Sequence, residues 1–121
     1  MIENIQMAGV HTKLTAEEED YITRKIGPMD KFIPKKAREA TKAEVKIKQQ
    51  KSKDQAKFTC EVVMHLPHEP ITVHERATTV LASIDLAEDK LKRQLRKYKE
   101  RHGGPRIHRR LIVKFTRTKK R

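Results

Sequence analysis

The spacing of apolar residues changes twice along this chain of 121 residues. Between residues 42 and 77 apolar and polar residues alternate, as at Val45, Ile47, Val62 and Met64, which is typical of strands with one buried face. On both sides of this segment apolar residues recur at steps of three and four, the spacing of one helix face. The chain is therefore predicted to place an antiparallel meander between two amphipathic helices.

The first helix is predicted to begin after Thr15, because Thr15 and Glu18 have the spacing of a capping box. Pro28 removes a backbone hydrogen bond and clashes with the preceding turn, so a kink or a break into two helical pieces is expected there. The helix is expected to end before Pro34. Its apolar face is formed by Ile22, Ile26, Met29 and Ile33.

The element order predicts the fold class. Residues 2–8 alternate weakly and indicate a first strand, and residues 78–101 carry the last apolar stripe at helical spacing. The order β-α-β-β-β-α predicts an α+β fold with a four-stranded sheet and two helices packed on one face, similar to double-stranded RNA-binding domains. A right-handed crossover makes the first two strands parallel. We expect one domain over residues 1–102 and a basic tail over 103–121, which could add a strand or lie extended.

Positive charge is concentrated near the C-terminus. Residues 1–85 carry 14 Lys and Arg against 13 Asp and Glu, whereas residues 86–121 carry 15 against 3. Such a cationic segment repels itself and contributes nothing to a core, so a polyanionic partner is expected. No run of about 18 apolar residues occurs, so a membrane span is not expected. The first residues lack an export signal, which predicts a cytoplasmic protein.

Residues with catalytic or metal-binding chemistry do not cluster in the sequence. Cys60 falls at an inward strand position and is interpreted as a small core residue. His65, His68 and His74 lack the spacing of a metal site and have no Cys or carboxylate pair beside them. The sequence therefore predicts a protein that is not an enzyme and that holds no metal or cofactor.

The last helix carries the best candidate site. At 100° per residue, Arg93 lies opposite the apolar stripe, with cations on both flanks. Asp89 and Glu88 precede Arg93 and Lys92 by four residues, so those pairs partly neutralise each other. Towards the end of the helix, Glu100 is the only acidic residue near the cations in the sequence. One flank carries Lys90, Lys97 and Arg101, and the other carries Lys92, Arg96 and Lys99.

The type of polyanion is less constrained by the residues. Only five aromatic residues are present, and most of them fall on predicted core faces, so an aromatic platform for stacking bases is missing. Recognition of the phosphate backbone and of shape is favoured over base reading. The meander followed by a basic helix also resembles double-stranded RNA-binding domains.

Residues 77–101 resemble the second helix of the ribosome hibernation-promoting factor family, also called ribosome-associated inhibitor or sigma-54 modulation protein. The segment Lys25-Ile26-Gly27 and the pair Lys31-Phe32 extend the similarity to the first helix, so that it covers about residues 1–102. The matching residues are Ile84, Asp85, Asp89, Lys90, Leu91, Arg93, Gln94, Leu95, Lys97 and Lys99.

The chain departs from the family pattern in three places. Thr79, Val80 and Leu81 replace a common Asp-Met-Tyr, and Pro28 is atypical. The C-terminal dimerisation domain of long members is replaced by the basic tail, so the chain resembles a short form. Joining of ribosomes through that domain is therefore not expected.

The resemblance implies a non-catalytic translation inhibitor that occupies the mRNA and tRNA sites of the small ribosomal subunit. Its partners would be 16S-type rRNA and ribosomal proteins, with no small-molecule substrate, and the free protein would be a monomer. The alternative is a general double-stranded RNA-binding or RNA-chaperone module acting off the ribosome. The residues expected to contact RNA are Arg24, Lys25, Lys31, Lys90, Lys92, Arg93, Arg96, Lys97, Lys99, Arg101, Arg109 and Arg110.

Overall fold

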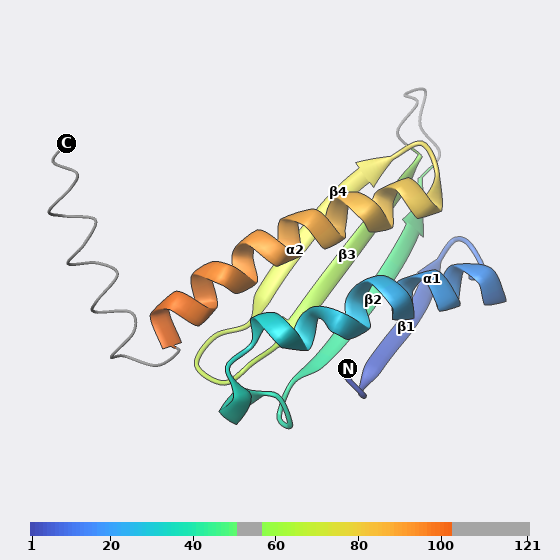
Figure 1. The fold of residues 1–121 in the computed structure, drawn as a ribbon. Coiled ribbons are helices and arrows are strands. Elements are labelled where there is room, and N and C mark those ends of the chain that lie inside the picture. The colour runs from blue at the N-terminus through green and yellow to red at the C-terminus, as the bar shows by residue number, and fades with distance from the viewer. Residues whose placement is uncertain (51–56, 103–121) are drawn as a thin grey trace, which may run out of the picture.

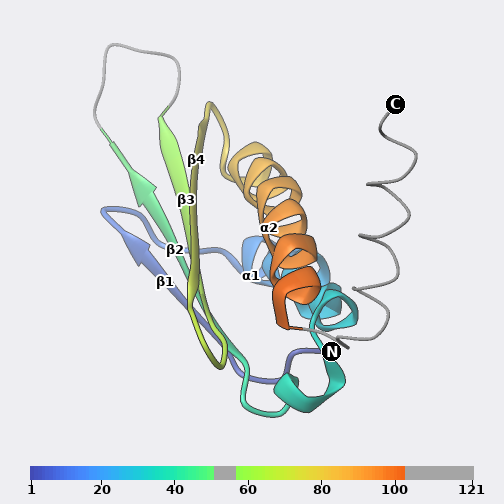
Figure 2. The ribbon, with the colours of Figure 1, turned by 90° about the vertical axis from the view of Figure 1, so that its left-hand side faces the viewer.

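Both helices of the protein lie on one face of a four-stranded sheet (Figure 1). The computed structural model describes residues 1–50 and 57–102. Seen along the sheet, α1 and α2 stand side by side on the same side of it, so the described part of the chain forms two layers (Figure 2). The elements are β1 (Ile5–Val10), α1 (Ala16–Ile26), η1 (Gly27–Phe32), η2 (Lys35–Ala37), β2 (Lys42–Gln49), β3 (Phe58–His65), β4 (Ile71–Ala77) and α2 (Val80–His102).

The strands are ordered β1-β2-β3-β4 across the sheet. β1 and β2 run parallel and are joined through α1, whereas β2, β3 and β4 form an antiparallel meander. The register places Met7, Val45, Val62 and Val73 in one row across all four strands. This row faces the helices, and the last three of these residues are almost fully buried. The predicted α+β class, element order and parallel first pair are confirmed.

The break expected in the first helix occurs at Gly27, the residue before Pro28. The predicted capping box is present, because the Thr15 amide donates to Glu18 Oε1 at 3.0 Å and the Glu18 amide donates to Thr15 Oγ1 at 3.1 Å. α1 ends at Ile26, and the chain continues as the 3₁₀ helix η1, with Pro28 in its first turn. A tighter helix suits this place because proline cannot donate the bond that would continue α1.

The first strand begins later than its apolar pattern predicts. Ile2 lies outside β1, which starts at Ile5 and extends to Val10. The Ile2 amide donates to the Gly27 carbonyl at 2.8 Å, and the terminal amine of Met1 lies 2.8 Å from Asp30 Oδ2. This hydrogen bond and ion pair hold the start of the chain against the α1–η1 junction and keep it out of the sheet ladder.

The core fills the space between the sheet and the helices. The apolar stripe of α2 is buried as predicted, including Tyr98 at 0% exposure. Cys60 is also fully buried on β3, and burial raises the pKa of its thiol to about 12, so it remains a neutral core residue at physiological pH. Because the apolar side of α2 is buried in the core, the opposite side of the helix faces outward.

Candidate nucleic-acid interface

Polar contacts join α1 and α2 through Lys25 of α1 and the carboxylates Asp85 and Glu88 of α2. The Tyr21 hydroxyl donates to Asp85 Oδ1 at 2.6 Å, and this bond raises the pKa of Tyr21. Lys25 Nζ lies 3.7 Å from Asp85 Oδ1 and 3.7 Å from Glu88 Oε1, and Glu88 is the main cause of the raised pKa of Lys25. Lys25 is therefore already paired between the two helices.

The middle of α2 carries cations that each have an acidic partner. Arg93 Nη2 lies 2.8 Å from Asp89 Oδ2, which confirms the predicted pair at four-residue spacing. Lys92 Nζ lies 4.0 Å from Glu88, and Lys90 Nζ reaches across to Glu75 of β4 at 3.5 Å. On α1, Arg24 similarly pairs with Asp20 at 3.2 Å. Exposed pairs of this kind contribute about 0–1 kcal/mol, so an RNA phosphate can displace these carboxylates at little cost.

Past Leu95, α2 presents three cations of a different kind. Arg96, Lys97 and Lys99 are all exposed, and no carboxylate among residues 1–50 and 57–102 lies within ion-pair distance of them. The same holds for Lys31 on η1. These four residues, Lys31, Arg96, Lys97 and Lys99, are named the unpaired cations below. They combine exposure with uncompensated charge, which suits contact with phosphate groups.

Phe32 brings two of the unpaired cations to one ring. Lys31 Nζ lies 5.3 Å from the centre of the Phe32 ring, and Arg96 Cζ lies 5.4 Å from it. Phe32 is half-buried and packs against the core, so η1 fixes this ring beside α2. Because two positive groups repel each other and neither has a counter-charge, an anion bound next to both would be favoured.

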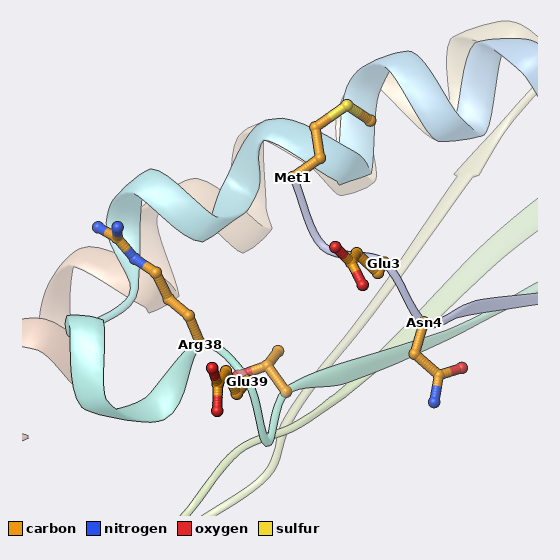
Figure 3. Close-up of a pocket in the computed structure, with 6 residues that line it drawn as sticks. Met1, Glu3, Asn4, Arg38 and Glu39 are labelled. Atoms are coloured by element: carbon orange, nitrogen blue, oxygen red, sulfur yellow. The ribbon is translucent and has the colours of Figure 1, made fainter.

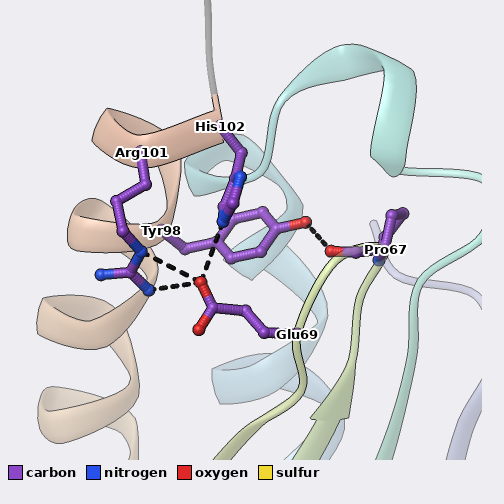
Figure 4. A network of polar contacts seen from close by, with 5 residues as sticks. All are labelled: Pro67, Glu69, Tyr98, Arg101 and His102. Atoms are coloured by element: carbon purple, nitrogen blue, oxygen red, sulfur yellow. Dashed lines mark hydrogen bonds and ion pairs between the residues drawn. The ribbon is translucent and has the colours of Figure 1, made fainter.

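Arg101 differs from its predicted state. Glu100 is the only acidic residue close to Arg101 in the sequence, but Arg101 Nη2 lies 2.6 Å and Nε 3.0 Å from Glu69 Oε2 (Figure 4). His102 Nε2 contacts the same oxygen at 2.9 Å. Glu69 belongs to the connection between β3 and β4. The expectation that Arg101 has few acidic partners is therefore wrong, since the fold supplies one from a distant segment.

The carboxyl group of Glu69 has a pKa below its ordinary value, first because of the hydrogen bond with His102 and then because of Arg101. A lowered pKa in the folded state stabilises the protein above the unfolded pKa, and this contribution is lost as the pH falls through the folded value. We expect Glu69→Gln to melt at a lower temperature than wild type at pH 6, and the difference between the two proteins to shrink as the pH falls below about 4. Melting curves across this range test the prediction. Glu39→Gln, at an exposed carboxylate with no ion pair among the described residues, is the control and should follow the wild-type curve.

Two further cations were not singled out in the sequence. Lys35 and Lys36 are exposed on η2, with no acidic partner among the described residues. η2 lies at the end of the molecule where α2 ends (Figure 1). The two consecutive lysines after Pro34 are the sequence pattern from which these cations could have been predicted. By contrast, Arg109 and Arg110 lie in the predicted tail 103–121, outside the described residues.

The face of the sheet opposite the helices has mixed charge. His65 Nε2 lies 3.2 Å from Glu44 Oε2, and His74 Nδ1 lies 3.4 Å from Glu61 Oε2. Within the described ranges, no three His, Cys, Asp or Glu side chains are arranged to hold a metal ion. No helix there is long and apolar enough to cross a membrane. On this face, histidines and carboxylates thus lie within ion-pair distance of one another, in contrast to the unpaired cations of η1 and α2.

A pocket beside the first residues of the chain is lined by none of the predicted RNA-binding residues (Figure 3). Two carboxylates, Glu3 and Glu39, and one guanidinium, Arg38, provide its charged groups. Arg38 Nε already donates to the Ile33 carbonyl at 3.0 Å. The lining residues are Met1, Glu3, Asn4, Arg38, Glu39 and Thr41.

A half-covered mixed sheet with a Lys- and Arg-rich helix on its covered side defines a class of small α+β proteins with one cationic helical face. The chain belongs to the sigma 54 modulation protein / S30EA ribosomal protein family, whose model matches residues 5–103. The resemblance noted from residues 77–101 is thereby confirmed.

Individual relatives agree with the family assignment. The ribosome hibernation promotion factor of Picosynechococcus sp. (strain ATCC 27264 / PCC 7002 / PR-6) is 42% identical over 52 residues, which cover 43% of this chain and 27% of the relative. The N-terminal domain of Thermus thermophilus Protein Y has a TM-score of 0.67 at 24% identity, over 78% of this chain and 98% of that one. A ribosomal subunit interface protein from Coxiella burnetii has a TM-score of 0.64 at 21% identity, over 79% and 97%. These two structures support the fold.

Proposed function

We propose that this chain is a ribosome-binding hibernation factor that inhibits translation without catalysis. It occupies the mRNA and tRNA sites of the small subunit through contacts with the rRNA backbone. Family membership over residues 5–103 supports the ribosome as partner, as do the names of its relatives. The observation that carries the proposal is the set of unpaired cations on the outer side of η1 and α2, a surface suited to rRNA phosphates.

The proposed inhibition is steric. A rigid sheet-and-helix body places α2 against rRNA, so mRNA and the anticodon arms of tRNA are excluded from the volume that it fills. The paired cations of α1 and of the middle of α2 contribute by exchanging their carboxylates for phosphates. Each phosphate that is neutralised releases counterions, so binding weakens steeply as salt rises.

The same proposal assigns different roles to two parts of the chain. Residues 1–102 form the ribosome-binding domain, and residues 103–121 act as a basic tail with eight Lys and Arg and no acid, including Arg109 and Arg110. The tail adds charge towards rRNA. The protein acts in the cytoplasm and is a monomer away from the ribosome.

Competition on the ribosome tests this proposal. The purified chain is incubated with small ribosomal subunits and sedimented, with and without prior loading of mRNA and initiator tRNA. We expect the chain to sediment with empty subunits and to be excluded from loaded ones. Equal binding to loaded and empty subunits contradicts the proposed sites. Preference for free duplex RNA over subunits at equal salt supports the general RNA-binding alternative instead.

A further inference from the structure

Three aromatic rings form a series at the C-terminal end of α2. The rings of His68 and His102 are stacked, with centroids 4.5 Å apart and an interplanar angle of 8°. The Tyr98 ring lies 4.6 Å from that of His102 at an angle of 50°. Tyr98 is fully buried, His102 is half-buried and His68 is exposed. The series therefore runs from the core to the surface and ends in an exposed imidazole.

The backbone of His68 is held in a conformation that favours glycine. Its φ of 79° lies in the left-handed region, where glycine fits best and where Asn, Asp and His are the more tolerant of the other residues. Such a conformation persists only where its surroundings enforce it, and it is concentrated at functional sites. A loop whose only task was to join β3 and β4 would be less strained with glycine at this position.

Both neighbours of His68 are anchored to α2 (Figure 4). The Tyr98 hydroxyl donates to the Pro67 carbonyl, and Glu69 accepts from Arg101 while it also contacts His102. The turn is thus fixed on each side of His68, and the His102 ring packs against one face of the His68 ring. A ring fixed in this way loses little conformational entropy when a flat ligand stacks on it.

We propose that His68 is a stacking site for an unpaired nucleobase of RNA. The flat ligand is inferred from the stacked imidazoles. Nucleic acid is inferred because the stack lies at the end of the cationic helix, one turn beyond Lys97 and Lys99. Every base has a π-face, so such a site accepts single-stranded RNA with little sequence preference. The proposal rests on the proposed function in taking RNA as the ligand, and it adds a base contact to recognition of the backbone.

Two single-stranded oligonucleotides of the same length separate base from backbone. One is hexa-adenylate and the other is its abasic counterpart, which carries the same phosphates. We expect wild-type protein to bind hexa-adenylate about fivefold more tightly at equal salt, near the low end of base–aromatic stacking effects. In NMR spectra, the ring protons of His68 should shift upfield with hexa-adenylate only, while those of His74 on the open sheet face stay in place. Equal affinity for the two oligonucleotides, or equal shifts with both, overturns the proposal.

Substitutions assign the effect to the ring. His68→Asn retains a residue that tolerates the left-handed backbone and is expected to abolish the preference for hexa-adenylate. His74→Asn is the matched control and should keep it. A preference that survives in His68→Asn contradicts the proposal, and the wild-type comparison decides the matter without any variant. Ribosome sedimentation is a separate readout, so a base preference without ribosome binding would reject the proposed function and leave this site standing.

Discussion

Replacing Arg96, Lys97 and Lys99 by glutamate is expected to abolish co-sedimentation with small ribosomal subunits while the protein stays folded. All three side chains are exposed on the outer side of α2, and none has an acidic partner among the described residues. The substitution removes three positive charges and adds three negative ones opposite rRNA phosphates. Where weak binding remains measurable at low salt, the log–log dependence of affinity on salt should flatten by about three units, roughly one for each lost contact.

The matched control changes the same charge elsewhere. Lys13, Lys46 and Lys57 are exposed and have no ion pair within the described part of the chain, and they lie before α1, on β2 and next to β3. Their replacement by glutamate produces the same net charge as the α2 variant and should retain most of the binding. Equal loss in both variants indicates that overall charge governs binding, and unchanged binding of the α2 variant removes these residues from the interface. Far-UV circular dichroism establishes that both variants are folded.

Much of the fold was predictable because the information is local. The alternation at Val45 and Val62 defines strands, and the three- and four-residue spacing in α2 defines which side of the helix is buried. The ion pair between Asp89 and Arg93 was predictable for the same reason, since four residues make one turn. Pro28 also identified the end of α1 from its covalent structure alone.

Contacts between segments that are far apart in the sequence could not be predicted from sequence patterns. The Glu69–Arg101 pair depends on how the β3–β4 connection meets the end of α2, and Lys90 reaches Glu75 only because β4 lies beside that helix. These two pairs add Lys90 and Arg101 to the partly neutralised cations, whereas helix spacing identifies only the pairs of Lys92 and Arg93. Likewise, the position of Phe32 beside Arg96 requires the packing of η1 on α2.

The stacking of the His68 and His102 rings could not be predicted for a different reason. Phe, Tyr and Trp, the usual platforms for bases, are too few in this chain to predict stacking. The spacing of the histidines tests only for a metal site. The stacked pair of His68 and His102 joins residues from a turn and a helix end, and no periodicity in the chain indicates that their rings are parallel.

Replacing Leu95 by alanine is expected to cost about 2–5 kcal/mol of unfolding free energy, because this side chain is fully buried between α2 and the sheet. The loss combines the missing apolar contacts with the cavity that remains. For a domain of this size the melting temperature should fall by roughly 10 °C or more, as 1 kcal/mol corresponds to about 4–8 °C in small domains.

Leu86 of the same helix provides an internal control for this substitution. It is 46% exposed, so Leu86→Ala makes the same chemical change with little loss of buried surface and should alter stability by no more than about 0.5 kcal/mol. Alanine favours helix at both positions, so helix propensity does not separate the two variants. Urea unfolding measures both free energies. Equal destabilisation would contradict the assignment of the buried side of α2, and with it the orientation that turns Arg96, Lys97 and Lys99 towards RNA.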